Sequence, residues 1–555
     1  MDRISAFARR RRIKNLEDWT MYAILTESFF LALSPTVAAA AVMIGVITWF
    51  LRIQIDSKYK MRSLPFDVPF AIFLLMGAIS VFLSSARSIE LIYNYLMLVG
   101  IYGLTYLIVG QTVRTPAQIK QMAQALGASA LLVVLWGFFQ FLFGVDIADV
   151  KWTDPEAFPE LRKRVFSTME NPNVLAGYLD VFICLALGLL AKIENRSQKI
   201  VLIGAIVMLA ACLAMTYSRG AFLTLVVVVA IYSVLNDWRV LILFAAIGGL
   251  ISYNDSTFVD RILSAFTMSD SSEGVRVGIW VSTISMIADH PFAGIGWGAY
   301  QFVYPQYNYY VADTNIIIYH AHNIYLNYAA EIGIVGALAF FWYFFGTMFM
   351  SLALNSNERY VKGASFLNEL AERILASSKL LKYLSATKEH IKFQLENFAN
   401  RVLDLFSPKD KKPPLKLKKG RKHYREVIHN EEMNFSEHTR KKFAEDDDKV
   451  TSIEEIAVGG EKISVKSVQI DTVEEEKPPL VDWNDVTNID DKQFLDGLKL
   501  GIGLAFLSMA LNGFTDDLLF NIPSSMLMWL LAALGAAIHL QGGGAYEENY
   551  ISSDD

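Results

Sequence analysis

The sequence predicts an all-α, polytopic integral membrane protein of about 12 transmembrane helices that carries a charged insert. Hydrophobic residues make up 53% of the 555 residues and charged residues only 19%, and the mean hydropathy is +0.33. The charge is unevenly distributed, because residues 355–492 hold 51 of the 106 charged residues. The rest of the chain is about 13% charged, against about 25% in soluble domains, which excludes a water-soluble globule.

Membrane spans are predicted from runs of about 20 mainly apolar residues, because the hydrocarbon core is about 30 Å thick and a helix rises 1.5 Å per residue. Backbone amides within lipid must be satisfied internally, so even the valine-rich run at 225–231 is interpreted as helix. Twelve runs are found, at residues 20–33, 36–53, 68–84, 91–110, 123–143, 173–191, 200–216, 221–236, 240–252, 323–353, 495–511 and 522–540. The first ten form a transmembrane domain of residues 20–353, and the last two occupy residues 495–540.

The orientation follows from the basic residues, which are enriched in short cytoplasmic loops. Residues 1–19 are rich in arginine, and basic residues also lie in the loops after the second, fourth and sixth spans: Lys58, Lys60, Arg62, Arg114, Lys120, Lys192, Arg196 and Lys199. These positions share one side of the membrane, so both termini, including the tail at 541–555, are predicted to be cytoplasmic. The loop at 254–322 is external. Arg162, Lys163 and Arg164 depart from this bias, and we interpret them as interfacial charge or as part of an anion-binding surface.

The cytoplasmic insert, residues 354–494, is predicted to have two parts. Apolar residues recur at helical spacing over 357–406, which indicates amphipathic helices. From residue 408 onward the sequence is polyampholytic, which is typical of a solvated disordered linker. Alternatives are a basic patch on anionic lipid, a regulatory tether, or a site for a cytoplasmic protein partner through residues 355–492. The two cysteines, Cys184 and Cys212, lie inside predicted spans, so no structural disulfide or zinc site is expected.

Three polar residues at the external ends of predicted spans are candidates for chemistry. Arg219 lies at the turn between the seventh and eighth spans, Arg276 in the long external loop, and His322 where that loop re-enters the membrane. Guanidinium groups match phosphate oxygens, so two of them could clamp a diphosphate, although each alone could be a membrane anchor or a partner of a carboxylate. Histidine can take and return a proton near neutral pH, so His322 is a candidate general base or a hydrogen-bonded structural residue. His320 forms a His-x-His pair without a third ligand at a suggestive spacing, so no metal site is predicted.

Two further groups of residues have alternative interpretations. Aromatic residues in the external loop could stack on sugars or form an interfacial aromatic belt: Trp280, Tyr300, Tyr304, Tyr307, Tyr309 and Tyr310. Three carboxylates, Glu27, Asp180 and Glu331, lie within predicted spans and could be buried in hydrogen bonds between helices. Asp180 and Glu331 could instead pair with an arginine or orient the histidine. We do not include these carboxylates as catalytic residues.

The motifs around these residues resemble the superfamily of bacterial O-antigen ligases and polymerases. Residues 290–298 read His-Pro-Phe-Ala-Gly-Ile-Gly-Trp-Gly and are similar to its His-Pro-x-x-Gly-x-Gly loop. His322-Asn323 is followed after nine residues by Gly-Ile-Val-Gly at 333–336, which resembles its His-Asn-x9-Gly-x-x-Gly signature. Residues 171–177, 218–220 and 276–280 are also similar to family blocks. The resemblance covers most of the spans and stops at the insert.

The resemblance implies a metal-independent, inverting glycosyltransferase of the GT-C type in the bacterial cytoplasmic membrane. The donor would be a glycan on undecaprenyl diphosphate, and the acceptor a hydroxyl at the outer face of the membrane. His322 is carried over as the catalytic residue, and Arg219 and Arg276 as diphosphate ligands. Asn323, His320, Trp280 and Arg164 are expected to support them. No cofactor and no nucleic acid is expected.

Several functions remain open at this point. A polymerase would use another lipid-linked repeat unit as its acceptor, whereas a ligase would use a lipid core, a surface polymer or a protein; we favour the polymerase slightly. A transporter, as some relatives have been labelled for inorganic carbon, would place charged and helix-breaking groups near the bilayer midplane in repeated halves. A scaffold that recruits partners through its insert would leave the external motifs unused.

Overall fold

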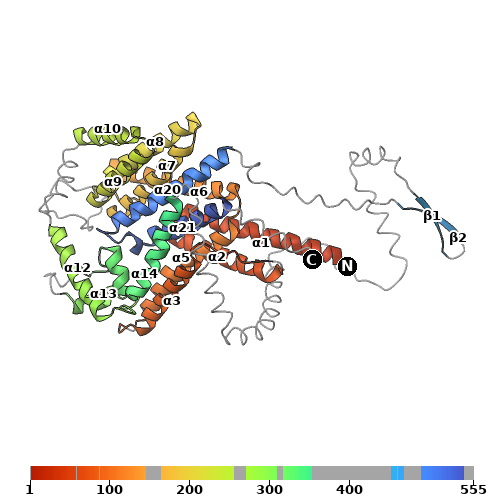
Figure 1. Cartoon of the computed structure of the whole chain (residues 1–555), viewed down its shortest axis with the longest axis horizontal. Coiled ribbons are helices and arrows are strands. Elements are labelled where there is room, and N and C mark those ends of the chain that lie inside the picture. The colour runs from red at the N-terminus through yellow and green to blue at the C-terminus, as the bar shows by residue number, and fades with distance from the viewer. Residues whose placement is uncertain are drawn as a thin grey trace. The chain divides into compact units, whose positions relative to one another are not determined.

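The computed structural model describes residues 2–57, 59–86, 88–144, 164–254, 271–308, 317–352, 452–458, 461–467 and 489–542. The chain divides into two units, residues 1–402 with 489–555, and residues 403–488. Figure 1 labels the helices and strands of both units.

The first unit is a bundle of helices. In chain order these are α1 (Asp2–Phe30), α2 (Pro35–Ile55), α3 (Asp67–Leu83), α4 (Ile89–Asn94), the π-helix η1 (Tyr95–Ile101), α5 (Tyr102–Thr112), α6 (Pro116–Phe143), α7 (Pro172–Lys192), α8 (Arg196–Ala214), α9 (Arg219–Leu235), α10 (Arg239–Asn254), α12 (Ser271–Asp289), α13 (Tyr300–Val303), η2 (Tyr304–Gln306), α14 (Ile324–Leu352), α20 (Ile489–Asn512), η5 (Leu518–Phe520) and α21 (Ile522–Gly542).

The described residues contain eight helices that are long and apolar enough to cross a membrane. These are Pro35–Ile55, Ile89–Thr112, Pro116–Phe143, Pro172–Lys192, Arg196–Ala214, Ile324–Leu352, Asp491–Asn512 and Ile522–Gln541. Three shorter apolar helices, Asp67–Leu83, Arg219–Leu235 and Arg239–Tyr253, accompany them. Each of these eleven helices coincides with a predicted span, which confirms a multi-pass helical membrane protein. The number of spans and their orientation stay predictions.

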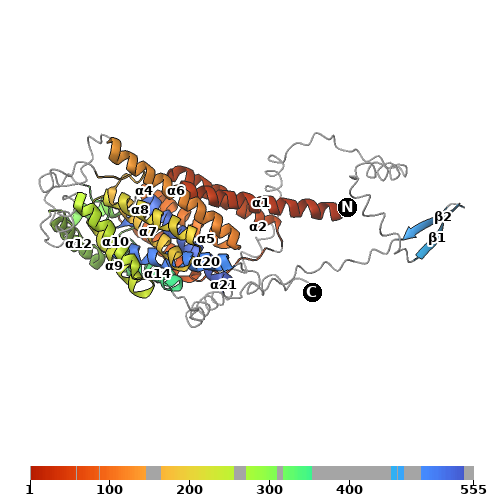
Figure 2. The same cartoon turned by 90° about the horizontal axis from the view of Figure 1, so that it is seen from above.

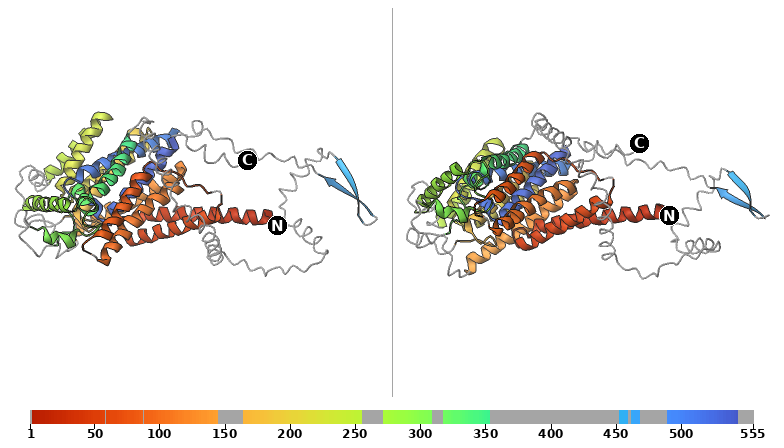
Figure 3. Two further views of the ribbon diagram at one scale, coloured as in Figure 1. Left: turned by 60° about the horizontal axis from the view of Figure 1, so that its bottom comes forward. Right: turned by 90° about the horizontal axis from the view of Figure 1, so that it is seen from below.

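The first predicted span is the exception, because it belongs to a longer helix. α1 is continuous from Asp2 to Phe30, so the basic segment at 1–19 and most of the span at 20–33 form one element. Its N-terminal part extends beyond the rest of the bundle (Figure 3). The Nε of Arg9 donates to the carbonyl oxygen of Ile55 at 2.9 Å, which ties the basic segment to the end of α2.

The centre of the bundle is formed by helices that approach one another closely. Every side chain of α7 from Val174 to Gly188 is buried, and α20 lies alongside it (Figure 2). A Cβ at Gly188 would lie 2.2 Å from the backbone nitrogen of Gly501, so only glycine allows this contact. Gly497 and Gly501 are spaced four residues apart, which is the spacing that lets membrane helices pack backbone to backbone. This contact joins the N-terminal half of α20 to the C-terminal half of α7.

A kink in α14 joins two of the sequence motifs. Gly333 has φ 71°, which interrupts the helix. The carbonyl oxygens of Ala330 and Glu331 accept hydrogen bonds from the amides of Ile295 at 2.8 Å and Gly296 at 3.0 Å, in the loop at 290–298. A Cβ at Gly333 would lie 2.2 Å from the carbonyl oxygen of Phe292. The glycines of both motifs therefore serve one interlock between loop and helix.

A small second core lies beside this interlock, at the end of the bundle opposite the N-terminus of α1 (Figure 1). Apolar side chains of α12, α13 and the loop between them, such as Ile279, Met286 and Tyr300, form most of it, together with Leu91, Tyr304, Ile318 and Ala321. The rings of Tyr300 and Tyr304 stack at 5.7 Å, and the hydroxyls of Thr283 and Tyr300 are hydrogen-bonded at 2.6 Å. This core holds α12, and with it Arg276, in place.

The second unit contains a hairpin that the sequence analysis did not predict. Strands β1 (Ser452–Val458) and β2 (Glu461–Ser467) pair antiparallel, with Ser452 opposite Ser467 and Val458 opposite Glu461. The polyampholytic composition of this stretch predicts a disordered linker, because its charge is high. Its sequence also holds alternating isoleucine and valine around Gly459-Gly460, which is a hairpin signal. The amphipathic helices predicted at 357–406 lie outside the described residues.

Candidate functional site

A polar cavity of about 120 Å³ lies where the start of α9, residue 276 of α12 and the loop between α20 and α21 meet. It is lined by Arg164, Asn173, Tyr217, Ser218, Arg219, Gly220, Ala221, Arg276, Asn512, Thr515, Asp516 and Leu518. Arg219 and Arg276, separated by 57 residues in the sequence, thus line one cavity together with Arg164. Three guanidinium groups around one small space favour an anion.

The turn that carries Arg219 is tightly constrained. Tyr217 has φ 52°, a left-handed conformation that is unfavourable for a bulky residue. Arg219 is the first residue of α9, whose N-terminal end carries partial positive charge. A Cβ at Gly220 would lie 2.8 Å from the Oγ1 of Thr515, so glycine lets the turn approach the loop that closes the other side of the cavity.

Arg164 and Asn173 connect this turn to the opposite wall. The Nε of Arg164 donates to the carbonyl oxygen of Thr216 at 2.7 Å, and its Nη2 donates to the Oδ1 of Asn173 at 2.8 Å. The side-chain amide of Asn173 in turn donates to the Oδ2 of Asp516 at 3.4 Å. The side chain of Asn171 caps α7 by accepting a hydrogen bond from the backbone N–H of Asn173. This bond fixes Asn173 in the first turn of that helix.

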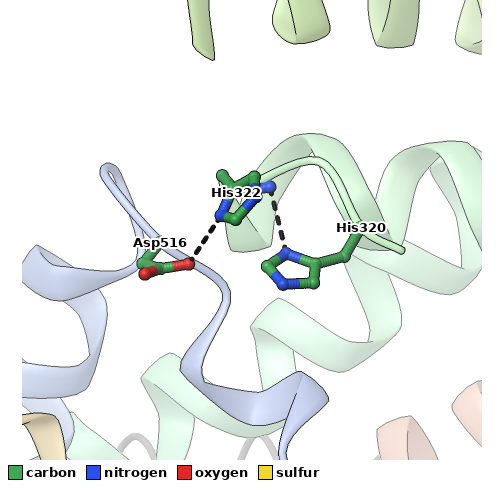
Figure 4. Close-up of side chains that lie close together, drawn as sticks. All are labelled: His320, His322 and Asp516. Carbon is green, nitrogen blue, oxygen red and sulfur yellow. Dashed lines mark hydrogen bonds and ion pairs between the residues drawn. The ribbon is translucent and has the colours of Figure 1, made fainter. Parts of the chain in front are cut away.

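Asp516 contacts both the cavity and the predicted base. Its Oδ1 lies 3.0 Å from the Nδ1 of His322 (Figure 4) and accepts from the amide of Asp517 at 2.9 Å, while its Oδ2 lies 3.9 Å from the Nη2 of Arg276. Burial alone would raise the pKa of Asp516, but the hydrogen bond from His322 and the positive charges nearby outweigh it and hold that pKa well below its usual range. Asp516 is therefore ionised and can only accept, so Nδ1 of His322 donates.

The start of α14 positions His322 by docking on the loop after α20. The amide of Ile324 donates to the carbonyl oxygen of Gly513 at 2.8 Å. Asn323 donates from its side chain to the carbonyl oxygen of Phe514 at 3.1 Å and accepts from the amide of Leu326 at 3.0 Å. His322 itself has φ 49°, which is a left-handed conformation. Backbone strain of this kind concentrates at functional sites.

His320 lies directly against His322. Its Nδ1 accepts from the backbone amide of His322 at 3.2 Å, and the two rings are 4.2 Å apart (Figure 4). Burial lowers the pKa of His320 to about 3, so the ring is neutral.

The cluster invites comparison with a metal centre. Nitrogen atoms of His320 and His322 and an oxygen of Asp516 lie within 4.8 Å of one another, so the structure supplies the third group that the sequence did not indicate. Such a spacing would allow a divalent cation. Three arginines in the adjoining cavity disfavour positive charge, and the hydrogen bonds described above account for the cluster. The absence of a metal stays a prediction.

The remaining predicted residues have other surroundings. Trp280 follows Arg276 by one helical turn on α12 but does not line the cavity. Tyr300 and Tyr304 are 0% and 3% exposed within the second core, so the sugar-stacking interpretation is wrong for these two. Tyr307 donates to the Oδ2 of Asp289 at 2.8 Å. Tyr309 and Tyr310, like Arg162 and Lys163, lie outside the described residues.

The carboxylates within the spans form hydrogen bonds inside the bundle. Glu27 accepts from the hydroxyl of Thr105 at 2.6 Å, and Asp180 accepts from the side-chain amide of Asn512 at 3.1 Å. Glu331 is hydrogen-bonded to the backbone of the loop that follows residue 297. The interpretation as hydrogen bonds between helices is confirmed for Glu27 and Asp180.

The carboxylate that contacts the histidine is Asp516, which the sequence analysis missed. It lies 194 residues after His322, beyond the charged insert. The available signal was the pair Asp516-Asp517 at the predicted external turn between the last two spans.

Comparison with known proteins places a family domain over this site. Residues 178–341 match the family model described as O-Antigen ligase, which confirms the predicted resemblance. No curated protein matches the chain. The matched stretch contains Arg219, Arg276, His322 and both glycine motifs, whereas Asn173 and Asp516 lie outside it. The apolar helices indicate a multi-pass membrane protein, and the match indicates similarity to the glycosyltransferase-like enzymes of the O-antigen ligase family.

Proposed function

We propose that this protein transfers a glycan from an undecaprenyl-diphosphate-linked donor to an acceptor hydroxyl at the outer face of the bacterial cytoplasmic membrane. The observation that supports this most directly is that Arg219, Arg276 and Asp516 line one cavity. The Oδ1 of Asp516 also lies 3.0 Å from the Nδ1 of His322. Cations for a diphosphate and a base for a hydroxyl are thereby adjacent.

The arginines bind and stabilise the diphosphate. As the glycosyl bond breaks, negative charge develops on the departing diphosphate, and fixed guanidinium groups lower the energy of that transition state. Arg219 at the start of α9 and Arg276 on α12 approach from different elements, so the group is held between them. Arg164, anchored to Thr216 and Asn173, supplies a third positive charge. With these cations in place, the reaction needs no metal ion.

His322 activates the acceptor. Because its Nδ1 donates to ionised Asp516, its Nε2 is the nitrogen that can accept a proton. Nε2 takes the proton of the acceptor hydroxyl, the oxygen forms a bond to the anomeric carbon, and the bond from that carbon to the diphosphate oxygen breaks with its electron pair going to the diphosphate. A single displacement inverts the anomeric carbon. His322 then releases its proton to water, and Asp516 stabilises the intervening imidazolium.

The acceptor that we favour is a second lipid-linked repeat unit, which makes the protein a repeat-unit polymerase. A polysaccharide ligase would use the same cations and the same base with a different acceptor. A transporter is less well supported, because the arginines gather at a cavity beside loops and helix ends rather than along a path through the bundle.

The experiment that tests the function uses purified protein in nanodiscs with undecaprenyl-diphosphate-linked repeat units. Gel electrophoresis and mass spectrometry of the product should show elongated glycan. Arg276→Ala and His322→Ala should each lower the rate by about 100-fold or more, because each removes a charge or a base that acts in the transition state. Arg239→Ala, an exposed arginine at the start of α10, is the matched control and should leave the rate unchanged.

Two outcomes would contradict the proposal in different ways. Full activity of both site variants would show that the residues have other roles. Absence of transfer by the unmodified protein with every matched donor and acceptor would refute the activity itself.

A further inference from the structure

The backbone of His322 needs a partner to hold its conformation. Its φ of 49° lies in the left-handed region, which is unfavourable for a residue with a Cβ. The conformation matters because it determines where the ring lies, and the ring must place Nδ1 on Asp516. The amide of His322 donates to the Nδ1 of His320 at 3.2 Å, so the side chain of His320 is that partner.

The ring of His320 is itself fixed. It is packed between the ring of His322 at 4.2 Å and the ring of Phe520 at 4.7 Å. Phe520 belongs to η5, in the same loop as Asp516. The histidine pair and the carboxylate are therefore held by one compact set of contacts between the start of α14 and the loop before α21.

The ring of His320 is neutral and can accept a hydrogen bond, but its low pKa makes it a poor base. The titratable groups that face it are His322, Asp516 on the α20–α21 loop, and Arg276 on α12. Burial is the largest influence and lowers the pKa of His320 to about 3. The ring stays neutral at physiological pH, and because Nδ1 accepts a hydrogen bond, its proton resides on Nε2.

We propose that His320 is a positioning residue, which holds His322 in its left-handed conformation by accepting its backbone N–H and thereby keeps Nδ1 of His322 on Asp516. This inference rests on the proposed function, in which His322 is the base. It assigns His320 neither proton transfer nor metal binding, and both of those roles are outcomes of the test.

The test compares two substitutions in the full-length protein in nanodiscs. In His320→Asn the side-chain oxygen replaces Nδ1 as the acceptor, whereas His320→Phe keeps a ring against Phe520 but has no acceptor. We expect His320→Phe to lower kcat by about 10- to 100-fold with the KM for the donor unchanged, because misplacing a base by about 1 Å costs up to about 100-fold. His320→Asn should stay within about 5-fold of the unmodified protein, with the same pH profile of kcat.

Several results would overturn the inference. Equal losses in both variants, or none in either, would show that the acceptor atom is not what matters. Loss of one limb of the pH profile in His320→Asn would identify His320 as a group that transfers protons. Inhibition by EDTA that is reversed by Zn²⁺, and is absent in both variants, would identify it as a metal ligand.

A spectroscopic measurement separates failure of this inference from failure of the proposed function. Protein labelled with ¹⁵N-histidine gives signals from eight histidines, which His320→Asn and His322→Ala assign by loss of a signal. The His320 ring should show the neutral form protonated on Nε2 from pH 5 to 9. The amide shift of His322 should persist in His320→Asn and move in His320→Phe. An unmoved shift in His320→Phe would contradict the inference even in a protein without transfer activity.

Discussion

The carboxylate of Asp516 determines which nitrogen of His322 is available for chemistry. One oxygen holds Nδ1 at 3.0 Å, and the other faces Asn173 and Arg276. The same side chain thus belongs to the base and to the anion cavity. Because Arg276 approaches it only to 3.9 Å, the arginine can also contact an anion in the cavity.

The neighbouring Asp517 has the opposite electrostatic character. It is 4% exposed, and burial, together with the charge of Asp516, raises its pKa to about 7. In the folded protein this carboxyl is neutral below about pH 7, whereas in the unfolded chain it ionises near its ordinary pKa of 3.8. Between these values the unfolded state binds fewer protons, so rising pH lowers stability by up to about 1.4 kcal/mol per pH unit.

Asp517→Asn tests this directly, because the amide has no charge to lose. We expect the Tm of the variant, relative to the unmodified protein, to rise between pH 5 and pH 8, as measured by intrinsic fluorescence in nanodiscs. A difference in Tm that stays constant across this range would show that Asp517 does not titrate there.

At the residue scale, the sequence predicted the groups that lie within recognisable motifs. Arg219, Arg276 and His322 could be named because their neighbours resemble family blocks, and the fold brings the two arginines to one cavity. Asp516 could not be assigned, because its partner is 194 residues away and no local pattern encodes that contact. Asn173 belonged to a similar block, but its bridge between Arg164 and Asp516 depends on how α7 packs.

The elements owe their positions to glycines as much as to apolar residues. The apolar runs predicted eleven helices of the bundle, since each run is long enough to require internal hydrogen bonding in lipid. The interlock between the loop at 290–298 and the kink at Gly333 was not predicted. The spacing of glycines in a sequence does not show which of them has positive φ, nor which amide will bind the carbonyl oxygens that a kink leaves without a helical partner. The β1–β2 hairpin was not predicted, because the high charge of this segment indicated disorder although its apolar residues alternate along the chain.

The kink in α14 can be tested by Gly333→Ala. The residue has φ 71°, and its new Cβ would lie 2.2 Å from the carbonyl oxygen of Phe292, so the loop at 290–298 must move. We expect a loss of about 1–3 kcal/mol of stability, seen as a lower Tm, and reduced transfer because His322 lies two residues before the start of α14. Gly204→Ala on α8, where nothing lies within 4 Å, is the control and should leave both unchanged. Equal behaviour of the two variants would contradict the structural role of Gly333.

The whole molecule consists of an apolar helical body and a highly charged insert. Helices α12 and α13, which supply Arg276 to the cavity and much of the second core, lie at the end of the body that is opposite the N-terminus of α1 (Figure 1). The predicted topology would place this end outside the cell, where a lipid-linked glycan is presented. The net charge of −6 reflects the average of body and insert, whereas the cavity itself is lined by three arginines.

The central claim is that a lipid diphosphate binds between Arg219 and Arg276, beside His322. A cryo-electron microscopy structure of the protein in nanodiscs with undecaprenyl diphosphate tests it most directly. We expect density for the two phosphates within the cavity, in contact with both guanidinium groups, and with the Nε2 of His322 facing the phosphate from the side where the sugar would be attached. A diphosphate bound elsewhere on the protein, with the cavity empty, would contradict it.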